Sequence, residues 1–147
     1  MLNSSIKILK ILPPELAHSL TIKALKYFKF SVDSVDDPIL SQHLMGLDFQ
    51  NPIGLAAGFD KNAEVIKSMF SIGFGFVEVG TITPLPQKGN QKPRIFRLEQ
   101  DYGIINSLGF NNKGSLRVKK NLSKLKKNFT ENKIIGINLG KNKNSIN

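Results

Sequence analysis

The chain has 147 residues, of which 40% are hydrophobic and 22% charged, a composition typical of one globular domain rather than of a disordered chain. It contains no cysteine, which excludes disulfides, thiolate metal ligands and a cysteine nucleophile. The net charge of +10 indicates an anionic partner, but only three of the 21 basic residues are arginine, the residue best suited to planar readout of bases and phosphates. We therefore predict no nucleic-acid partner.

Residues 4–30 are predicted to form two short helices separated by a Pro-Pro step, with Pro14 at the first position of the second helix. Apolar residues recur in that helix every four positions, at Leu16, Leu20, Ala24 and Phe28, with Ala17 and Leu25 beside this stripe. Lysines share the segment: Lys7, Lys10, Lys23, Lys26 and Lys29. Such a helix either packs on a core with a solvated basic face or lies in a membrane interface near anionic lipid.

No apolar run approaches the ~20 residues of a membrane-spanning helix. The N-terminus also lacks the small-residue cleavage site of a secretory signal. We therefore expect the chain in the cytoplasm or on its membrane face.

The rest of the chain alternates between strand and helix patterns. Residues 31–40 are acidic and indicate a linker, and residues 43–54 indicate a hairpin or two extended pieces. Strands are then predicted at 53–58, 74–81 and 133–142, and helices at 61–73, closed by Gly73, and at 115–129. This alternation predicts a parallel α/β sheet whose strands are buried on both faces.

Small and polar residues follow all three predicted strands, at the carboxyl ends where parallel α/β proteins bind ligands. These ends read Ala57-Gly58-Phe59-Asp60-Lys61, Gly80-Thr81 and Asn138-Leu139-Gly140-Lys141. Each one alone is explained by a tight turn, a strand cap or loop backbone. Their coincidence at equivalent strand ends favours a binding site for a polar, planar ligand.

The connection from Ile82 to Asn111 is unusually long for a strand-to-helix loop, and such inserts commonly cover or complete a site. Residues 94–99 alternate like a hairpin strand, and the amide groups of residues 106–110 can hold a carboxylate or an imide. Neither GxGxxG nor a Walker loop is present. His18 and His43 lack metal-site spacing, so we interpret both as structural and predict no metal site.

Four segments carry a resemblance to a known family: NPIGLAAGFDKNAE, FGFVEVGTITPLPQKGNQKPRIFRL, GIINSLGFNN and GINLGKNK. Together they resemble the quinone-dependent, class 2 dihydroorotate dehydrogenases, flavoproteins of pyrimidine synthesis. The resemblance runs from about Leu44 to Asn147. The N-terminal helices look, more loosely, like the small unit that forms the quinone tunnel of this class at the membrane surface.

The resemblance implies an α/β fold that is the N-terminal part of a (β/α)8 TIM barrel, with about three of the eight strands, preceded by a small helical unit. Residues 1–36 would be the helical membrane and quinone-tunnel unit with its linker, and residues 37–147 an incomplete FMN-binding barrel. The implied location is peripheral, on the cytoplasmic face of the inner membrane.

The same resemblance assigns site residues. FMN would be bound by Ala57, Gly58, Phe59, Asp60, Lys61, Thr81 and Asn138. Dihydroorotate would be bound by Lys61, Asn106, Ser107, Leu108, Gly109 and Phe110. FMN would take a hydride as a base removes the neighbouring proton, and a membrane quinone would then reoxidise the flavin.

The serine that serves this family as base is expected beyond Asn147, and Ser145 comes too early to replace it. We therefore name no catalytic base in the chain and expect it to be truncated, with little or no activity alone. An alternative is a non-enzymatic, basic membrane- or RNA-binding remnant of such an enzyme. A class 1 enzyme that uses fumarate or NAD is disfavoured by the helical extension.

Overall fold

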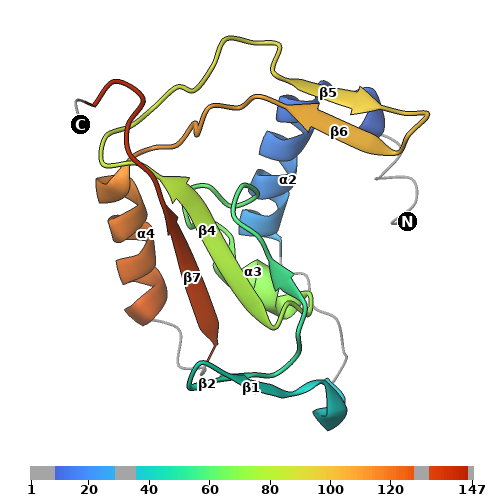
Figure 1. Cartoon of the computed structure of the whole chain (residues 1–147), viewed down its shortest axis with the longest axis vertical. Coiled ribbons are helices and arrows are strands. Elements are labelled where there is room, and N and C mark those ends of the chain that lie inside the picture. The colour runs from blue at the N-terminus through green and yellow to red at the C-terminus, as the bar shows by residue number, and fades with distance from the viewer. Residues whose placement is uncertain (1–8, 29–35, 128–132, 146–147) are drawn as a thin grey trace.

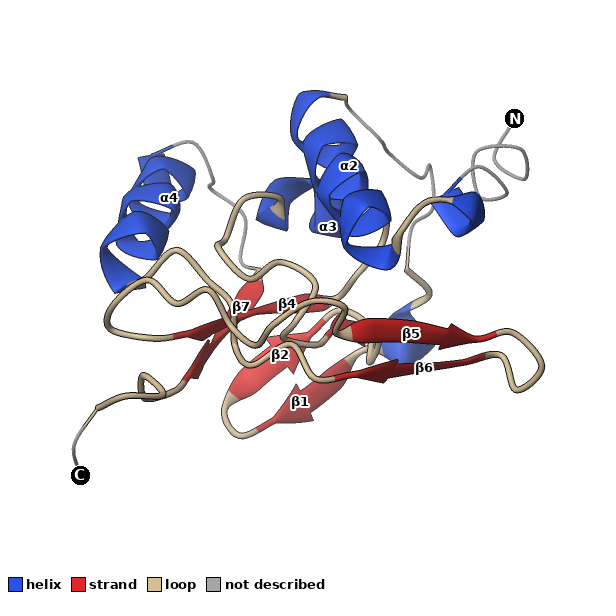
Figure 2. Ribbon diagram, turned by 90° about the horizontal axis from the view of Figure 1, so that it is seen from above, coloured by secondary structure: helices blue, strands red, loops and turns tan. Residues whose placement is uncertain are grey.

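The computed structural model describes residues 9–28, 36–127 and 133–145. At its centre lies a parallel sheet of three strands in the order β3-β4-β7, formed by β3 (Gly54–Leu55), β4 (Phe76–Ile82) and β7 (Ile134–Leu139). Helices α2 (Pro14–Tyr27), α3 (Ile66–Ser71) and α4 (Ser115–Lys127) all lie on one side of this sheet (Figures 1 and 2). The predicted parallel α/β arrangement is confirmed.

Two antiparallel hairpins flank the sheet. A 3-10 helix (Pro38–Leu40) leads into the hairpin of β1 (Gln42–Leu44) and β2 (Leu47–Phe49), at the opposite end of the sheet from the hairpin of β5 (Ile95–Leu98) and β6 (Gly103–Asn106). The β5–β6 hairpin lies against the beginning of α2 (Figure 1). Both hairpins confirm the sequence predictions.

The core lies between the sheet and the three helices. Val77, Val79 and Ile82 of β4 are buried there, and helices α3 and α4 add Met69 and Val118. Fully burying a side chain of this size contributes about 1.5–3 kcal/mol. This packing fixes the carboxyl end of β4 relative to the helices, and so fixes the edge of the sheet at which the predicted site residues gather.

Helix α2 begins at Pro14 as predicted, but its predicted apolar stripe does not face the core. Ala17 is buried, and Ile22 and Leu25 pack on the core, whereas Leu16 and Leu20 are 46% and 40% exposed. The small Ala17 lets the helix approach closely on that side, and the stripe points outward. Residues 9–11 are helical, and the rest of the first predicted helix, with Lys7 and Lys29, falls outside the described residues.

Two predicted boundaries were wrong. Strand β3 covers only Gly54–Leu55 instead of 53–58, and α3 begins at Ile66 instead of residue 61. The intervening loop does not continue either element because the carboxylate of Asp60 accepts hydrogen bonds from the backbone N–H groups of Asn62, Glu64 and Val65. A side chain that binds several nearby backbone groups stabilises a turn in place of a regular element.

The predicted burial of the strands on both faces is also wrong for the described residues. Ile137 and Leu139 of β7 are 48% and 74% exposed, because the helices cover only one face of the sheet. The opposite face, toward which Glu78 and Thr81 alternate with the buried valines of β4, is half-buried.

Candidate binding site at the strand ends

The site is built on the loop that follows β3. The backbone N–H of Gly58 donates to the carbonyl oxygen of Gly80 at 2.8 Å. The N–H of Gly80 donates in turn to the carbonyl oxygen of Asp60 at 3.1 Å. These bonds join the loop to the carboxyl end of β4. Gly58 adopts a φ of +116°, which favours glycine, and a Cβ there would project into open space. The loop therefore presents backbone, not side chains, over the strand ends.

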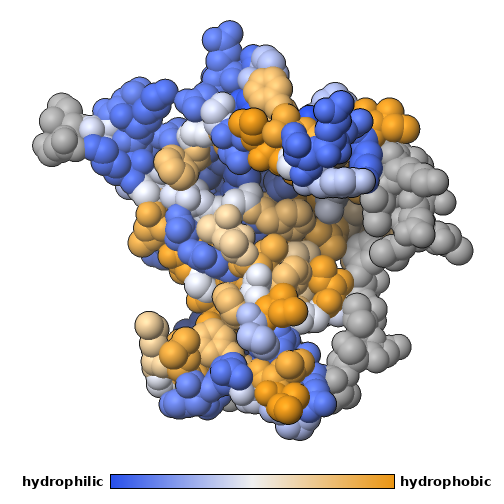
Figure 3. Space-filling view, turned by 45° about the vertical axis from the view of Figure 1, so that its right-hand side comes forward, coloured by the Kyte–Doolittle hydropathy of each residue, from blue (hydrophilic) through white to orange (hydrophobic). Residues whose placement is uncertain are grey.

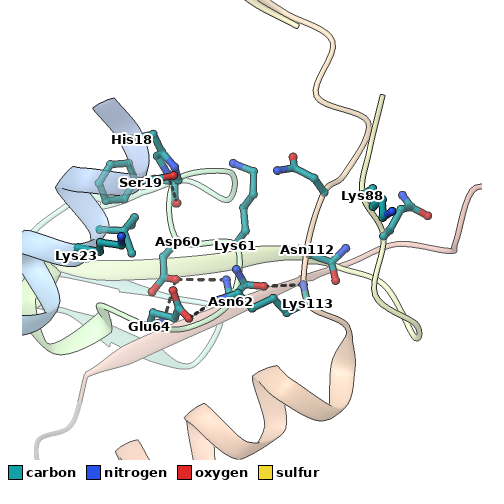
Figure 4. Close-up of a pocket in the computed structure, with 14 residues that line it drawn as sticks. His18, Ser19, Lys23, Asp60, Lys61, Asn62, Glu64, Lys88, Asn112 and Lys113 are labelled. Carbon is teal, nitrogen blue, oxygen red and sulfur yellow. Dashed lines mark hydrogen bonds and ion pairs between the residues drawn. The ribbon is translucent and has the colours of Figure 1, made fainter. Parts of the chain in front are cut away.

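The neighbours Asp60 and Lys61 have opposite roles. Asp60 is 1% exposed, and its carboxylate is occupied by the backbone N–H groups of the turn, at 2.8 Å for Glu64 and Val65. Lys61 projects away from that turn into the space between α2 and the segment around Asn112 (Figure 4). Asp60 thus holds the loop with its side chain, and Lys61 is the group offered to a ligand.

Lys61 is half-buried, and its ammonium group donates to the carbonyl oxygen of Gly58. Burial lowers the pKa of Lys61 below its ordinary value of 10.5. The negative charges of Glu15 and Asp60 oppose this shift, whereas the positive charge of Arg94 adds to it. An anion bound here would restore the favourable environment of the ammonium group.

Thr81 and Asn138 meet at the adjacent strand ends. The hydroxyl of Thr81 donates to the side-chain oxygen of Asn138 at 2.6 Å, and the amide nitrogen of Asn138 donates to Glu78 at 3.2 Å. The bonds orient both side chains on the edge formed by β4 and β7. The structure therefore brings together two predicted cofactor-binding residues that are 57 positions apart.

A cavity of about 400 Å³ lies between the loop after β3, the start of α2 and the β5–β6 hairpin. Residues predicted for the site line it: Gly58, Phe59, Lys61, Asn106 and Leu108. The side chains of Pro14, Ile95 and Ile104 add apolar surface. Ser107, Gly109, Phe110, Thr81 and Asn138 are not among its lining residues, so the structure gathers the predicted residues around more than one space.

A second cavity, of about 430 Å³, shares Lys61 with the first and is lined by Lys23, Glu64, Lys88 and Lys113 among others (Figure 4). Asn111 lines both cavities, and its side-chain oxygen is buried without a hydrogen-bond partner in the described part of the chain. A buried acceptor without a partner is costly, and a ligand that donates a hydrogen bond would satisfy it.

His18 was interpreted as structural, and it does bind the fold: its Nε2 donates to the carbonyl oxygen of Phe59 at 2.7 Å, and the two rings pack edge to face at 5.3 Å. Burial lowers its pKa, which favours the neutral ring. The imidazole also lines both cavities. The interpretation as a satisfied histidine is confirmed, but its place at the site was not predicted. His43 bonds Asp48 within the exposed β1–β2 hairpin.

Sequence reasoning missed the residues that tie the helix to the hairpin. Glu15 pairs with Arg94 and Lys92, and Arg97 donates to the carbonyl oxygens of residues 9, 10 and 12. The available signal was arginine itself: in a chain that otherwise uses lysine, two of the three arginines stand within four residues. A guanidinium can reach several acceptors in fixed directions, which an ammonium group cannot.

The strand ends fit a planar, polar cofactor such as FMN. Backbone near Gly58 is unobstructed, and Thr81 and Asn138 present a hydroxyl and an amide on the same edge. Asp60 contributes backbone only, since its carboxylate is already bound. The assigned FMN and substrate residues remain predictions at this point.

Comparison with known proteins gives the family. Residues 39–147 match the family model described as dihydroorotate dehydrogenase. This chain belongs to the dihydroorotate dehydrogenase family. It is 51% identical over 136 residues to the dihydroorotate dehydrogenase (quinone) of Rhizobium rhizogenes and 48% identical over 141 residues to that of Rhodopseudomonas palustris strain BisA53. These alignments cover 92% and 96% of the chain.

The solved structures of family members agree. The chain is similar to the dihydroorotate dehydrogenase of Eimeria tenella, both ligand-free and in complex with ferulenol, with a TM-score of 0.84 and 48% sequence identity over 91% of the chain. The predicted family and the predicted fold class, part of a barrel enzyme of this family, are confirmed. The chain spans 36% and 38% of the two bacterial relatives and 37–39% of the Eimeria chains.

We predict that the titration midpoint of Lys61 lies below pH 10.5, because burial disfavours the ammonium form. Nuclear magnetic resonance of the lysine side chains, with Lys61→Gln to assign the signal, measures the midpoint directly. Glu15→Gln should lower the midpoint further, since it removes a negative charge that favours the ammonium form. A midpoint at or above 10.5, or an upward change in Glu15→Gln, would contradict the described environment.

Proposed function

We propose that this chain forms the first wall of the active site of a quinone-dependent dihydroorotate dehydrogenase, which oxidises dihydroorotate to orotate. The observation that carries the proposal is that Lys61 and the segment containing Asn106 and Leu108 line one cavity next to the carboxyl ends of the parallel strands. In this scheme residues 37–147 are barrel and residues 1–36 are the helical unit with its linker.

FMN is the proposed cofactor, bound by Ala57–Lys61 through loop backbone and by Thr81 and Asn138 at the ends of β4 and β7. When bound, it supplies the electron acceptor for the oxidation. The chain's own contribution is a fixed set of donors and acceptors. Thr81 and Asn138 already hold each other in place, so little side-chain freedom has to be lost when they contact a ligand.

Dihydroorotate is an anion with a carboxylate and a ring imide, and the proposed site matches both groups. The ammonium of Lys61 supplies positive charge in a half-buried position, where a charge interacts more strongly than in water. The amide of Asn106 suits the ring, and the backbone around Gly109 suits the carboxylate. Charge that develops on the substrate as it is oxidised is stabilised by the same ammonium group.

A proton must also leave the substrate during the oxidation. We assign that step to no side chain of this chain, because the family resemblance puts the serine base after Asn147. Lys61 is held by the carbonyl of Gly58 and acts here as a fixed charge.

The apolar side of this same cavity, between α2 and the β5–β6 hairpin, is the proposed route by which quinone reaches the site. Pro14, Ile95 and Ile104 give it an apolar wall, and Lys61 also lines it. On the outside of the helix, Leu16, Leu20 and Phe28 are exposed beside Lys23 and Lys26, as expected for a helix at a membrane surface. Apolar residues also reach the surface among polar ones in Figure 3.

Among the described residues, no helix combines the length and the apolar character required to cross a membrane. The association that we propose is peripheral, through the exposed apolar residues of α2, on the cytoplasmic face of the inner membrane.

The enzyme proposal is tested in a chimera in which this chain replaces the matching 36% of the Rhizobium rhizogenes relative. We expect dihydroorotate-dependent quinone reduction, and we expect Lys61→Gln to lower kcat/KM by roughly 100-fold or more, the range for loss of one group that stabilises developing charge. Enzyme assays with flavin content measured in parallel give the result.

Lys119→Gln is the matched control, because Lys119 is exposed on α4, away from both cavities that Lys61 lines. A chimera that folds with bound flavin but loses no activity in Lys61→Gln would overturn the proposed role of Lys61. A chimera with flavin but without activity would contradict the proposed function.

The membrane proposal predicts that Leu16→Glu with Leu20→Glu reduces binding to vesicles rich in phosphatidylglycerol by at least tenfold, since two exposed apolar contacts are replaced by negative charges. Vesicle co-sedimentation measures the binding. Lys61→Gln should leave it unchanged. Equal binding of the double variant and the wild type would show that the outer face of α2 does not contact lipid.

A further inference from the structure

Arg94 is the most enclosed charged side chain of the β5–β6 region, at 6% exposure. Its Nη1 donates to the carbonyl oxygens of Lys88 at 2.7 Å and Asn90 at 2.9 Å, with a longer contact of 3.4 Å to that of Leu108. Its Nε donates to the carboxylate of Glu15. A buried charge is tolerated only when it is paired and hydrogen-bonded, and Arg94 meets both conditions.

These contacts join two arms of the long connection after β4, residues 87–94 and residues 106–112. The backbone also links them: Asn90 N–H donates to Leu108 at 3.0 Å, and Ser107 N–H donates to the carbonyl of Arg94 at 2.9 Å. The arms are so close that a Cβ at Gly89 would lie 2.2 Å from the carbonyl oxygen of Leu108. The shape of the 106–110 segment therefore depends on the arm that carries Arg94.

Glu15 connects this pair of arms to α2. It lies in the first turn of the helix, where negative charge is favourable, and it also pairs with Lys92 at 2.5 Å. The neighbouring Arg94 holds the pKa of Glu15 below its ordinary value of 4.5, against the opposing effect of burial, and Lys92 lowers it further. The helix and the 106–110 segment are thus linked through the Glu15–Arg94 contact, and Glu15 and Leu108 both line the cavity that Lys61 lines.

We propose that Arg94 is a positioning residue, held by Glu15, which fixes the 106–110 segment at the distance from Lys61 that binding of a cyclic carboxylate requires. Arg94 need not touch the ligand: it acts through the carbonyl oxygens that it holds. The position of α2 and the conformation of residues 106–110 are consequently coupled. The identity of the ligand rests on the proposed function, whereas the coupling rests on the contacts of Arg94 alone.

Only arginine meets this geometry. One guanidinium nitrogen serves the carbonyls of the two arms while another faces the carboxylate, in a rigid plane. Lysine at position 94 keeps the charge near Glu15 but has one nitrogen at the end of a flexible chain, so it cannot serve both sides in fixed directions. Arg94→Lys therefore keeps the positive charge beside Glu15 and removes the fixed contacts to the carbonyl oxygens of the two arms.

Hydrogen–deuterium exchange of the full chain tests the coupling. We expect Arg94→Lys to accelerate exchange about tenfold or more in peptides covering residues 84–94 and 104–113, because contacts to a charged group are lost, and to leave β4 (76–82) at the wild-type rate. Glu15→Gln, which keeps the carbonyl contacts of Arg94, should give the same pattern with a smaller change. Lys92→Gln is the matched control, since it removes only the exposed partner of Glu15.

Unchanged exchange in both arms in Arg94→Lys would overturn the proposal. Equal acceleration of β4, or loss of the folded state in both Arg94→Lys and Glu15→Gln, would also overturn it, because Arg94 would then support the whole fold rather than one segment.

A second readout addresses the ligand. Orotate is titrated by calorimetry into the full chain saturated with FMN, and we expect Arg94→Lys to raise the Kd of orotate about tenfold without changing the Kd of FMN or the thermal midpoint. An equal loss of FMN and orotate binding would contradict a positioning role. If the wild-type chain binds no orotate, the proposed ligand is contradicted for this chain, and the exchange experiment still decides the coupling.

Discussion

The site depends on one buried carboxylate. Asp60 binds the N–H groups of the turn that follows it, which ends the extended loop after β3 and delays the start of α3 until Ile66. The carboxylate of Asp60 is fully occupied by hydrogen bonds within this turn. The next side chain, Lys61, points away from the turn, toward the cavities that it lines (Figure 4). Lys61 is thus positioned by a structural residue, not by the end of a helix.

Around that turn, three parts of the chain that are distant in sequence converge. The parallel sheet brings Thr81 and Asn138 to one edge, the long connection after β4 brings Asn106, and α2 brings His18 and Glu15. Burial lowers the pKa of Lys61 although the negative charges of Glu15 and Asp60 oppose the shift, and the same half-buried position makes its ammonium group a strong partner for an anion. Helix α2 is part of the site, because Glu15 in its first turn pairs with Arg94, which also contacts the segment of residues 106–110.

Glycine, strand and helix signals are local, and they predicted the parallel sheet and both hairpins, while the resemblance of four motifs gave the family. They failed where tertiary contacts decide. The start of α3 depends on the side chain of Asp60, the outward face of α2 depends on how closely Ala17 approaches the core, and the open face of β7 depends on which elements cover the sheet. Glu15 and Arg94 are 79 residues apart, and no local pattern connects them.

The stability of Asp60→Asn tests the central claim most directly, because asparagine keeps the size of the side chain but replaces one acceptor oxygen with a donor. Chemical denaturation should show a loss of about 1.5–3 kcal/mol in the free energy of unfolding, the range for hydrogen bonds to a charged group. The same substitution at the exposed Asp101 is the control and should change little. A loss below about 0.5 kcal/mol, the scatter typical of surface substitutions, would show that the turn does not depend on Asp60 and would contradict the account of how Lys61 is positioned.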